Sequence, residues 1–183
     1  MYSVSLAKNI IQLQQIAALS KENLRGALTS EEKQSQGFIT LEYDLSLLEK
    51  LHTIAPAVIV SYKENVVGYA LTAFRESAPV MPAINEMISH LQTLSYQGRS
   101  LKDYQYYIMG QVCIAKEHRG KGLFDQLYQH HKASFSSRFE MLVTEVSTSN
   151  YRSLKAHKNI GFETINTYRD AMDEWDVVVW NWR

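Results

Sequence analysis

The chain has little of several residue types, and each scarcity excludes a class of protein. Its 183 residues include one cysteine, three prolines and eight glycines. Since one cysteine cannot form an intramolecular disulfide, Cys113 excludes a disulfide-stabilised fold and fits a reducing compartment, so we expect a cytoplasmic protein. The sequence also has no repeat, no low-complexity tract and no linker-like stretch, and we expect a single domain over residues 1–183.

An excess of charge of either sign is also missing. Lys and Arg together number 19, as do Asp and Glu, so the formal net charge is zero. This balance provides no global basic field of the kind that attracts nucleic acid. Near the N-terminus, three glutamines and Lys21 interrupt every apolar run, and no basic stretch precedes these runs. We therefore expect no nucleic-acid partner, no signal peptide and no membrane association.

Hydrophobic periodicity predicts a mixed α/β order of elements. The predicted strands cover residues 3–6, 57–62, 66–74, 104–115, 140–147, 162–169 and 174–182. The predicted helices cover residues 9–24, 45–55, 84–94, 122–138 and 150–160. Residues 57–74 form a predicted hairpin, and residues 104–160 form a strand–helix–strand–helix unit. The pattern of residues 26–43 is ambiguous.

Three local features refine this order. Residues 76–103 are interpreted as an inserted helix followed by a loop that contains Gly98. Gly110 interrupts a predicted strand, which indicates a bulge or a close approach of backbone. The apolar final strand, residues 174–182, either completes the sheet or pairs with a second subunit, so a homodimer is an open alternative.

The segment VCIAKEHRGKGLF, residues 112–124, has the features of an anion site. An apolar strand runs into a turn that holds Arg119, Gly120, Lys121 and Gly122, and a helix begins directly afterwards. The first N–H groups of a helix have no intrahelical acceptor and lie at the positive end of the helix dipole. Glycines let a phosphate approach such a backbone closely, so the segment predicts a phosphate or pyrophosphate site. Alternatively, the two glycines only make a tight turn.

Two common phosphate motifs do not fit this segment. A Walker A loop would need a glycine, a lysine and a hydroxyl residue at spacings that the chain lacks. A dinucleotide fingerprint that starts at Gly120 would need a small residue at position 125, where Asp125 stands instead. A carboxylate there would face the pyrophosphate.

A third pattern fits better and extends to a second segment. It is the loop [QR]-x-x-G-x-[GA], which Arg119 and Gly122 match, although Phe124 stands where a small residue is usual. The second segment is N-x-x-A-x-x-x-Y-x-x-x-G-F. At its offsets the chain has Asn150, Ser153, His157, Gly161 and Phe162. With both segments, the chain resembles the GNAT superfamily of acyl-CoA-dependent N-acetyltransferases over residues 57–169, most strongly over residues 107–162.

This resemblance implies a fold and a reaction. The fold is a mixed, mostly antiparallel central sheet with a splayed pair of strands at the coenzyme A site and helices on both faces. The reaction moves an acetyl group from acetyl-CoA, the acyl-donor co-substrate, to an amine of a small molecule or peptide by direct attack in a ternary complex. The positions implied to bind the coenzyme are Val112, Cys113, Ile114, Arg119, Gly120, Lys121, Gly122, Leu123, Phe124, Asn150 and Ser153. Asn150 is equally expected to cap the following helix.

The resemblance also suggests residues for proton transfer. His157 stands where relatives often have the tyrosine that protonates the leaving thiolate, and histidine can serve as an acid near neutral pH. A lone histidine on a helix is also commonly structural. Glu145 and Glu42 are candidate bases, and spacing selects neither. No metal is expected, because His130 and His131 point about 100° apart on a helix and no ligand motif accompanies them.

Two other functions remain compatible with the sequence. The missing tyrosine and the unassigned base leave open a non-catalytic acyl-CoA-binding or regulatory module on the same fold. A phosphate-binding α/β domain unrelated to coenzyme A is the other alternative. Residues 20–55 and 76–103 match no motif, and we expect them to build the acceptor pocket.

Overall fold

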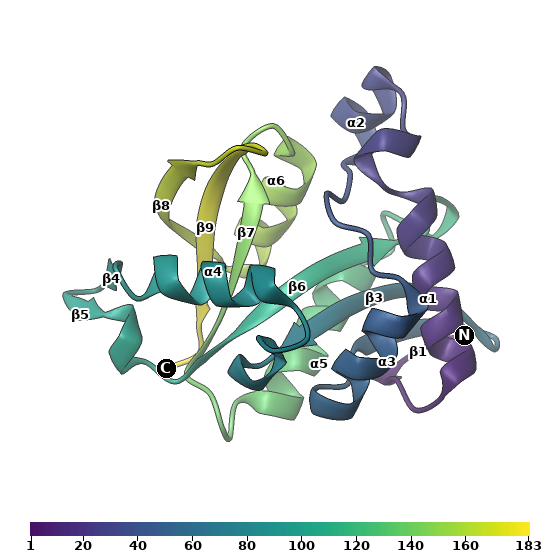
Figure 1. Ribbon diagram of the computed structural model, residues 1–183. Helices are drawn as coiled ribbons and strands as arrows, with labels where there is room; N and C mark the ends of the chain where they lie inside the picture. The colour runs from purple at the N-terminus through teal and green to yellow at the C-terminus, as the bar shows by residue number, and fades with distance from the viewer.

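A seven-stranded sheet runs through the molecule in the order β1-β2-β3-β6-β7-β9-β8 (Figure 1). The computed structural model describes the backbone of residues 1–183 and all their side chains except those of residues 34–36. The strands are β1 (Tyr2–Leu6), β2 (Val58–Tyr62), β3 (Asn65–Ala73), β6 (Tyr106–Ile114), β7 (Met141–Ser147), β8 (Glu163–Arg169) and β9 (Glu174–Asn181). Two short strands, β4 (Ser95–Tyr96) and β5 (Arg99–Ser100), form a separate hairpin.

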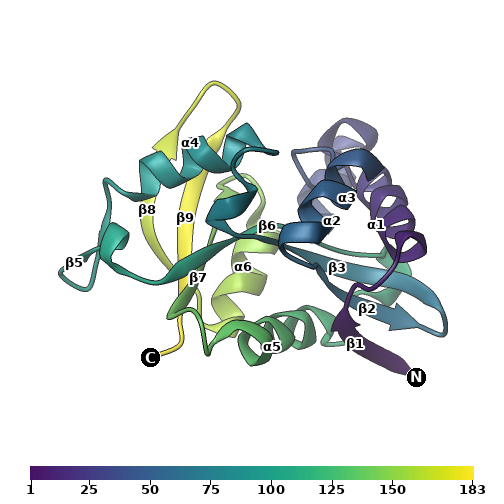
Figure 2. The same cartoon turned by 60° about the horizontal axis from the view of Figure 1, so that its bottom comes forward.

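Helices cover both faces of this sheet. They are α1 (Ile10–Glu22), α2 (Ser30–Gln36), α3 (Leu45–Ile54), α4 (Pro82–Leu91), α5 (Leu123–Phe135) and α6 (Tyr151–Ile160). Figure 2 shows α1, α3 and α4 on one side of the sheet and α5 and α6 on the other. Two clusters of buried residues fill the two interfaces, the first around Ile16, Leu48 and Leu91 and the second around Leu127 and Phe162. Within the described residues, no helix combines the length and apolar character that crossing a bilayer requires.

β6 and β7 are parallel neighbours that separate along their length. Their described pairing runs from Tyr106–Met141 to Ile108–Val143, although β6 continues to Ile114 and β7 to Ser147. Figure 1 shows β7 turning away from β6 beyond this point. The other pairings in the sheet are antiparallel. The splayed pair and the mostly antiparallel sheet predicted above are therefore confirmed.

A bulge lies on β6 where the two strands separate. The register between β3 and β6 shifts at Leu71 and Thr72, and Gly110 is the residue passed over on β6. A Cβ atom on Gly110 would lie 2.9 Å from the Tyr43 hydroxyl oxygen, so only glycine fits beside that ring. Across the split, the Thr144 hydroxyl donates a hydrogen bond to the Met109 carbonyl oxygen at 2.8 Å. The prediction of a bulge or close approach at Gly110 is confirmed.

Most of the predicted elements are present, and two regions add to the prediction. In residues 26–43 the structure has α2, whose first turn carries a capping box between Thr29 and Glu32. The predicted loop around Gly98 is a tight hairpin between β4 and β5, with positive φ at Gln97 and Gly98. β9 lies between β7 and β8, so the apolar final strand completes the sheet.

Candidate functional site

The split between β6 and β7 opens onto a pocket of about 240 Å³, here called the loop pocket. The end of β6, the turn of residues 119–124 and the start of α6 supply most of its lining. Ten of the coenzyme-binding positions that the resemblance implies line this pocket: Val112, Cys113, Ile114, Arg119, Gly120, Gly122, Leu123, Phe124, Asn150 and Ser153. Lys121 is not part of the lining. The structure thus brings two sequence motifs, about 30 residues apart, to one concavity.

The N-terminus of α5 faces this pocket without a side-chain cap among the described residues. Gly122 is its N-cap residue, and the first hydrogen bond of the helix runs from the Gln126 N–H to the Gly122 carbonyl at 3.2 Å. Gly120 and Gly122 have φ of +72° and +71°, and a Cβ atom on either would meet nothing within 4 Å. The N–H groups that precede Gln126 and the open space beside the glycines form a cradle that fits an anion such as a pyrophosphate.

The two cations of the turn are held by protein groups. The Arg119 guanidinium donates to the Ile114 carbonyl at 2.8 Å and to the Asn23 side-chain oxygen at 2.7 Å. Lys121 donates to the Tyr2 hydroxyl at 3.1 Å and to the carbonyl of Glu117 at 3.0 Å. Arg119 therefore fixes the turn against β6 and α1, whereas Lys121 fixes it against β1.

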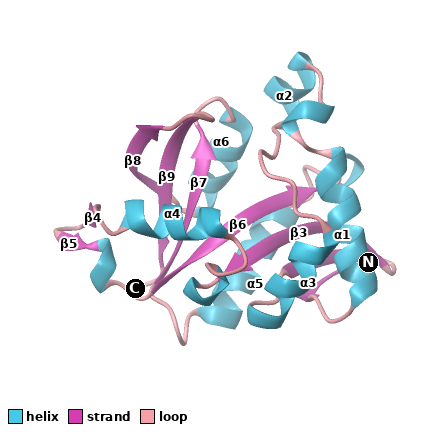
Figure 3. Cartoon of the chain, in the orientation of Figure 1, coloured by secondary structure: helices cyan, strands magenta, loops and turns pink.

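Residues 37–41, which we call the strap, run from α2 towards α3 across the split (Figure 3). Asn150 caps α6 by accepting a hydrogen bond from the Ser153 N–H at 3.3 Å, and its amide donates to the Phe38 carbonyl at 2.8 Å. Gln111 on β6 donates to the Leu41 carbonyl at 2.8 Å. The predicted cap is confirmed, and the same side chain also ties the strap to the pocket.

His157 is 1% exposed, and both of its ring nitrogens have partners. Its Nδ1 lies 2.8 Å from the Ser153 carbonyl, which can only accept, so Nδ1 carries the proton. Its Nε2 lies 2.6 Å from the Tyr128 hydroxyl and must then accept from it. Burial lowers the pKa of His157 to about 4, so the ring is neutral at physiological pH. This geometry favours a structural role for His157 over the role of an acid.

The two departures from the family pattern are neighbours in space. The Phe124 ring packs edge-on against His157 with ring centroids 5.1 Å apart, and against Tyr128 at 5.0 Å. Residue 124 is larger than the small residue of the family pattern, and residue 157 is smaller than its tyrosine. The two side chains thus fill one space between α5 and α6.

A second concavity, here called the α4 pocket, lies on the opposite face of the sheet and measures about 290 Å³. Its walls come from α4, the strap, the middle of β6 and the β8–β9 turn. A narrow space of about 70 Å³, the passage, lies between the two pockets. The passage shares Val112 and Ser153 with the loop pocket, and Met109 and Glu145 with the α4 pocket. Along the split, the passage therefore adjoins both the loop pocket with its anion cradle and the α4 pocket.

Glu145 on β7 lines both the passage and the α4 pocket. Its Oε1 is buried and has no hydrogen-bond partner among the described residues. Burial raises the pKa of this carboxyl group to about 7, with a smaller contribution from Asp170, while a hydrogen bond from Tyr168 opposes the shift. Glu42, the other candidate base, is exposed and lines neither pocket. Between the two carboxylates, the geometry favours Glu145.

Two other reactive side chains are passive in this arrangement. Burial raises the pKa of the Cys113 thiol to about 12, so it is not an activated nucleophile. His131 is fully buried, and its ring nitrogens lie 3.0 Å from the Tyr107 hydroxyl and 3.3 Å from the Ala70 carbonyl. The described residues include no group of three or more His, Cys, Asp or Glu that could hold a metal ion.

The sequence alone missed part of this lining. Asn23 enters the loop pocket from the end of the predicted helix 9–24, and the strap enters it from the ambiguous region 26–43. The Thr29 capping box was the signal that a helix precedes the strap. At and beside the β8–β9 turn, the residues that line the α4 pocket are Tyr168, Asp170, Met172 and Trp175. No local signal identifies these residues, because only the pairing of β9 with β7 places that turn beside the split.

Comparison with solved structures places this fold among acetyltransferases. The chain is similar to the ribosomal-protein-S18-alanine N-acetyltransferase of Escherichia coli, with a TM-score of 0.66 and 10% identity over 99% of this chain and 94% of that one. Naa50 of Arabidopsis thaliana, solved with the bisubstrate analogue CoA-Ac-MVNAL, has a TM-score of 0.63 and 15% identity over 99% of both chains. Salmonella typhimurium yncA, a putative acetyltransferase solved with acetyl-CoA, has a TM-score of 0.63 and 13% identity over 100% of this chain and 94% of that one. At these identities the similarity establishes the fold.

Sequence comparison addresses the family directly. No curated protein matches the chain in sequence. The profile of the Acetyltransferase (GNAT) family, however, matches residues 21–162, which is more than half of the chain. The matched range contains the whole lining of the loop pocket, Glu145 and all of the passage lining except Trp175. The chain therefore belongs to the Acetyltransferase (GNAT) family, and acetyl transfer from acetyl-CoA is the activity that this membership supports.

Proposed function

We propose that this protein is an N-acetyltransferase that moves the acetyl group of acetyl-CoA to a primary amine by direct attack in a ternary complex. The observation that carries the proposal is the passage, which adjoins both the loop pocket at α5 and the α4 pocket and is lined by Glu145. The loop pocket would hold the coenzyme, with its pyrophosphate at residues 119–124 and its pantetheine arm along Val112–Ile114. The α4 pocket would hold the amine.

Glu145 is the proposed general base. A primary amine is mostly protonated at neutral pH and attacks only as the free base. A carboxylate with a pKa of about 7 can accept the proton from the attacking nitrogen, directly or through one water. The nitrogen then bonds to the thioester carbonyl carbon, the carbon–sulfur bond breaks, and the thiolate leaves and takes a proton. The products are an N-acetyl amine and the free thiol of coenzyme A.

The reaction does not depend on an acid at position 157. The leaving group is a thiolate, and thiols ionise near pH 8.5, so its departure is easier than that of an alkoxide or amide. The neutral ring of His157, held by Ser153 and Tyr128, fits the role of a support for the wall of the passage. Cys113 is not needed as an acyl carrier, because its buried thiol resists ionisation.

The test combines binding, thiol release and product analysis. Calorimetry should detect acetyl-CoA binding, and a panel of primary amines should give amine-dependent thiol release with an N-acetyl product identified by mass spectrometry. The Cys113→Ala variant should retain the activity, and intact-protein mass spectra should show no acetylated enzyme. An acetylated Cys113 would contradict direct attack, and failure to bind acetyl-CoA would contradict the whole proposal.

One observation favours a second candidate function, a non-catalytic acyl-CoA-binding module. The position at which relatives often carry an acidic tyrosine holds His157, whose two nitrogens are already engaged. Tight acetyl-CoA binding together with no amine-dependent thiol release, in the wild type and in the Glu145→Gln variant alike, would favour this module over the enzyme.

A further inference from the structure

The α4 pocket combines apolar walls with acidic groups. Methionines contribute much of the wall from three directions, with Met81 and Met87 on the α4 side, Met109 on β6 and Met172 in the β8–β9 turn. The acidic side chains are those of Glu86 on α4, Glu145 on β7 and Asp170 in the turn. An apolar wall favours an apolar ligand body, and a set of carboxylates favours a positive or neutral ligand over an anion.

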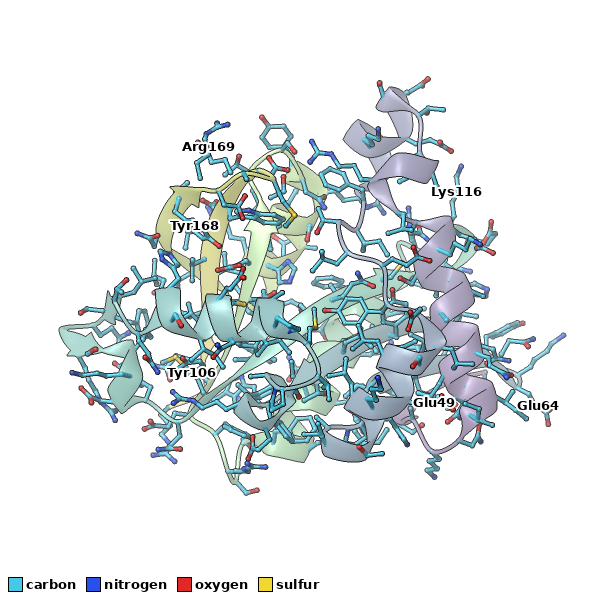
Figure 4. The ribbon with its side chains drawn as sticks, in the orientation of Figure 1. Glu49, Glu64, Tyr106, Lys116, Tyr168 and Arg169 are labelled. Carbon is cyan, nitrogen blue, oxygen red and sulfur yellow. The ribbon has the colours of Figure 1, made fainter. Side chains whose placement is uncertain are left out.

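The lining offers no cation to balance these acids. Among the described residues that line the α4 pocket there is no Lys and no Arg. The cation nearest in sequence is Arg169, which follows Tyr168 on β8 and so points to the other face of the strand. Its guanidinium forms an ion pair with Glu174 at 3.2 Å, and Figure 4 shows it apart from Tyr168. A ligand carboxylate would therefore enter this pocket without a charged partner, near Glu145.

Three polar atoms on residues that line the pocket are buried and have no hydrogen-bond partner among the described residues. They are the Glu145 Oε1 described above, the Nε2 of His90 on α4 and the Nε1 of Trp175 on β9. The His90 ring packs against Tyr168 at an interplanar angle of 40°, with ring centroids 4.1 Å apart. Buried polar atoms are normally paired, and those left unpaired in a pocket are places where a ligand can supply the missing partner.

The dimensions of the pocket favour a small ligand. A volume of about 290 Å³ lies at the small end of ligand-binding pockets. The amine group of the ligand has to reach Glu145 at the passage, so its body occupies the space between α4 and the β8–β9 turn.

We propose that the α4 pocket selects small primary amines with an apolar body and no negative charge, and that it rejects free amino acids and other anionic amines. This inference rests on the proposed function, since it assigns the α4 pocket to the acceptor. It goes further by naming the charge and polarity of that acceptor. A like charge beside a desolvated carboxylate is unfavourable, so among amines of the same size the structure predicts discrimination by charge.

The test compares tyramine, tyrosinamide and tyrosine, which share one apolar body and differ at the carboxyl position. Binding to the protein saturated with coenzyme A is measured by calorimetry at pH 8.5, above the pKa of about 7 of the Glu145 carboxyl group. We expect tyramine and tyrosinamide to bind, and tyrosine to bind weaker than tyrosinamide by about 50-fold or more. Equal binding of tyrosine and tyrosinamide would overturn the inference, as would failure of both tyramine and tyrosinamide to bind at millimolar concentration.

Variants then locate the source of the discrimination. Glu86→Lys and Asp170→Lys should each narrow the ratio between tyrosinamide and tyrosine, because each places a cation at the pocket. Glu64→Lys makes the same charge change on the β2–β3 turn, far from the α4 pocket in Figure 4, and should leave the ratio unchanged. An unchanged ratio in both pocket variants would overturn the assignment.

The two proposals fail in different ways. Binding of the amines is measured without turnover, so selection by charge is decided even when no thiol is released. A protein that binds acetyl-CoA and acetylates tyrosine as fast as tyrosinamide would keep the proposed function and lose this inference. A protein that selects the neutral amines and releases no thiol would keep the inference about the pocket and lose the enzyme.

Discussion

Glu145 lies on β7 with its Oε1 shielded from water, and this burial links its chemistry to pH. Its pKa is raised to about 7, so the carboxylate accepts protons only as the pH approaches and passes neutrality. We predict that kcat/KM of the wild type rises with pH through a step near 7. The Glu145→Gln variant should lose that step and fall in rate by about 10²- to 10⁴-fold, the usual contribution of a general base. If the variant keeps the step near pH 7, a group other than Glu145 causes the pH dependence.

The same burial predicts an effect on stability. A carboxyl group whose pKa is higher in the folded than in the unfolded state stabilises the fold at low pH, and this contribution is lost as the pH rises from about 4.5 to above 7. The neutral Glu145→Gln variant avoids the desolvated charge. We predict that it is more stable than the wild type at pH 8 by up to about 3 kcal/mol, and no more stable at pH 4. Urea unfolding at the two pH values measures the difference.

His157 and Tyr128 should behave as a structural pair. Replacing His157 with Phe leaves the buried Tyr128 hydroxyl without a partner, which should cost about 1–3 kcal/mol in the free energy of unfolding. Below the melting temperature, turnover should change far less than it does in the Glu145→Gln variant. In the double variant with Tyr128→Phe, part of the stability should return. A large loss of turnover at full stability would restore the role of an acid to His157.

For single residues, the sequence predicts the position of a side chain in the fold better than it predicts the chemical role of that side chain. The motif offsets place Asn150 and His157 on one helix, of which Asn150 is the N-cap and His157 lies in the last turn. The role of His157 depends on Tyr128, which belongs to a different helix and is 29 residues away. The pKa of Glu145 depends on burial by the strap and α4, which no local pattern encodes. Contacts between distant segments decide both properties.

The loop that opens α5 makes a prediction at the scale of the element. Gly122 has a φ of +71° at the N-cap of the helix, so alanine there costs about 1–2 kcal/mol of backbone strain and adds a Cβ to the cradle. We predict that Gly122→Ala weakens acetyl-CoA binding by about tenfold or more, the loss expected for one charge-assisted hydrogen bond.

Gly98 provides the matched control for this change. It has a φ of +78° and open space beside it, but lies in the β4–β5 hairpin away from the loop pocket. Gly98→Ala should therefore lose similar stability and leave acetyl-CoA binding unchanged. Equal loss of affinity in the two variants would show that strain alone, and not the cradle, explains the effect.

Elements with strong periodicity were predictable, and the exceptions have physical reasons. The order from β6 to α6 follows from alternating apolar runs and amphipathic helices. The region that includes α2 and the strap was ambiguous, because α2 is short and the strap is held by side chains from elsewhere, such as Gln111 and Asn150. Its path therefore depends on tertiary contacts and not on its own propensity.

At the scale of the whole molecule, both ends of the chain contribute strands to the one sheet that contains the split. β1 lies at one edge, while β9, the last strand, lies inside the sheet beside β7. This arrangement brings the β8–β9 turn against α4 and the strap, so three distant parts of the sequence surround the α4 pocket. The family resemblance predicted the splayed strands, whereas the lining of the α4 pocket required the assembled fold.

The split also predicts how the whole molecule responds to ligand. Acetyl-CoA at 100 times its dissociation constant should stabilise the fold by about 2.7 kcal/mol through mass action. For a chain of this length, thermal unfolding should shift upward by roughly 2–4 °C per kcal/mol. The shift should shrink in Gly122→Ala and persist in Gly98→Ala. No shift at saturating acetyl-CoA would contradict binding in the loop pocket.

Beyond Ile108 and Val143 the described backbones of β6 and β7 do not pair, and the Thr144 side chain bonds to Met109 across the split. A ligand lying between them completes the sheet much as an added strand would. In a cell, the lifetime of this protein should therefore follow the supply of its own donor. When acetyl-CoA is scarce, more molecules open locally and become substrates for proteases, so abundance and activity would decline together under the same metabolic condition.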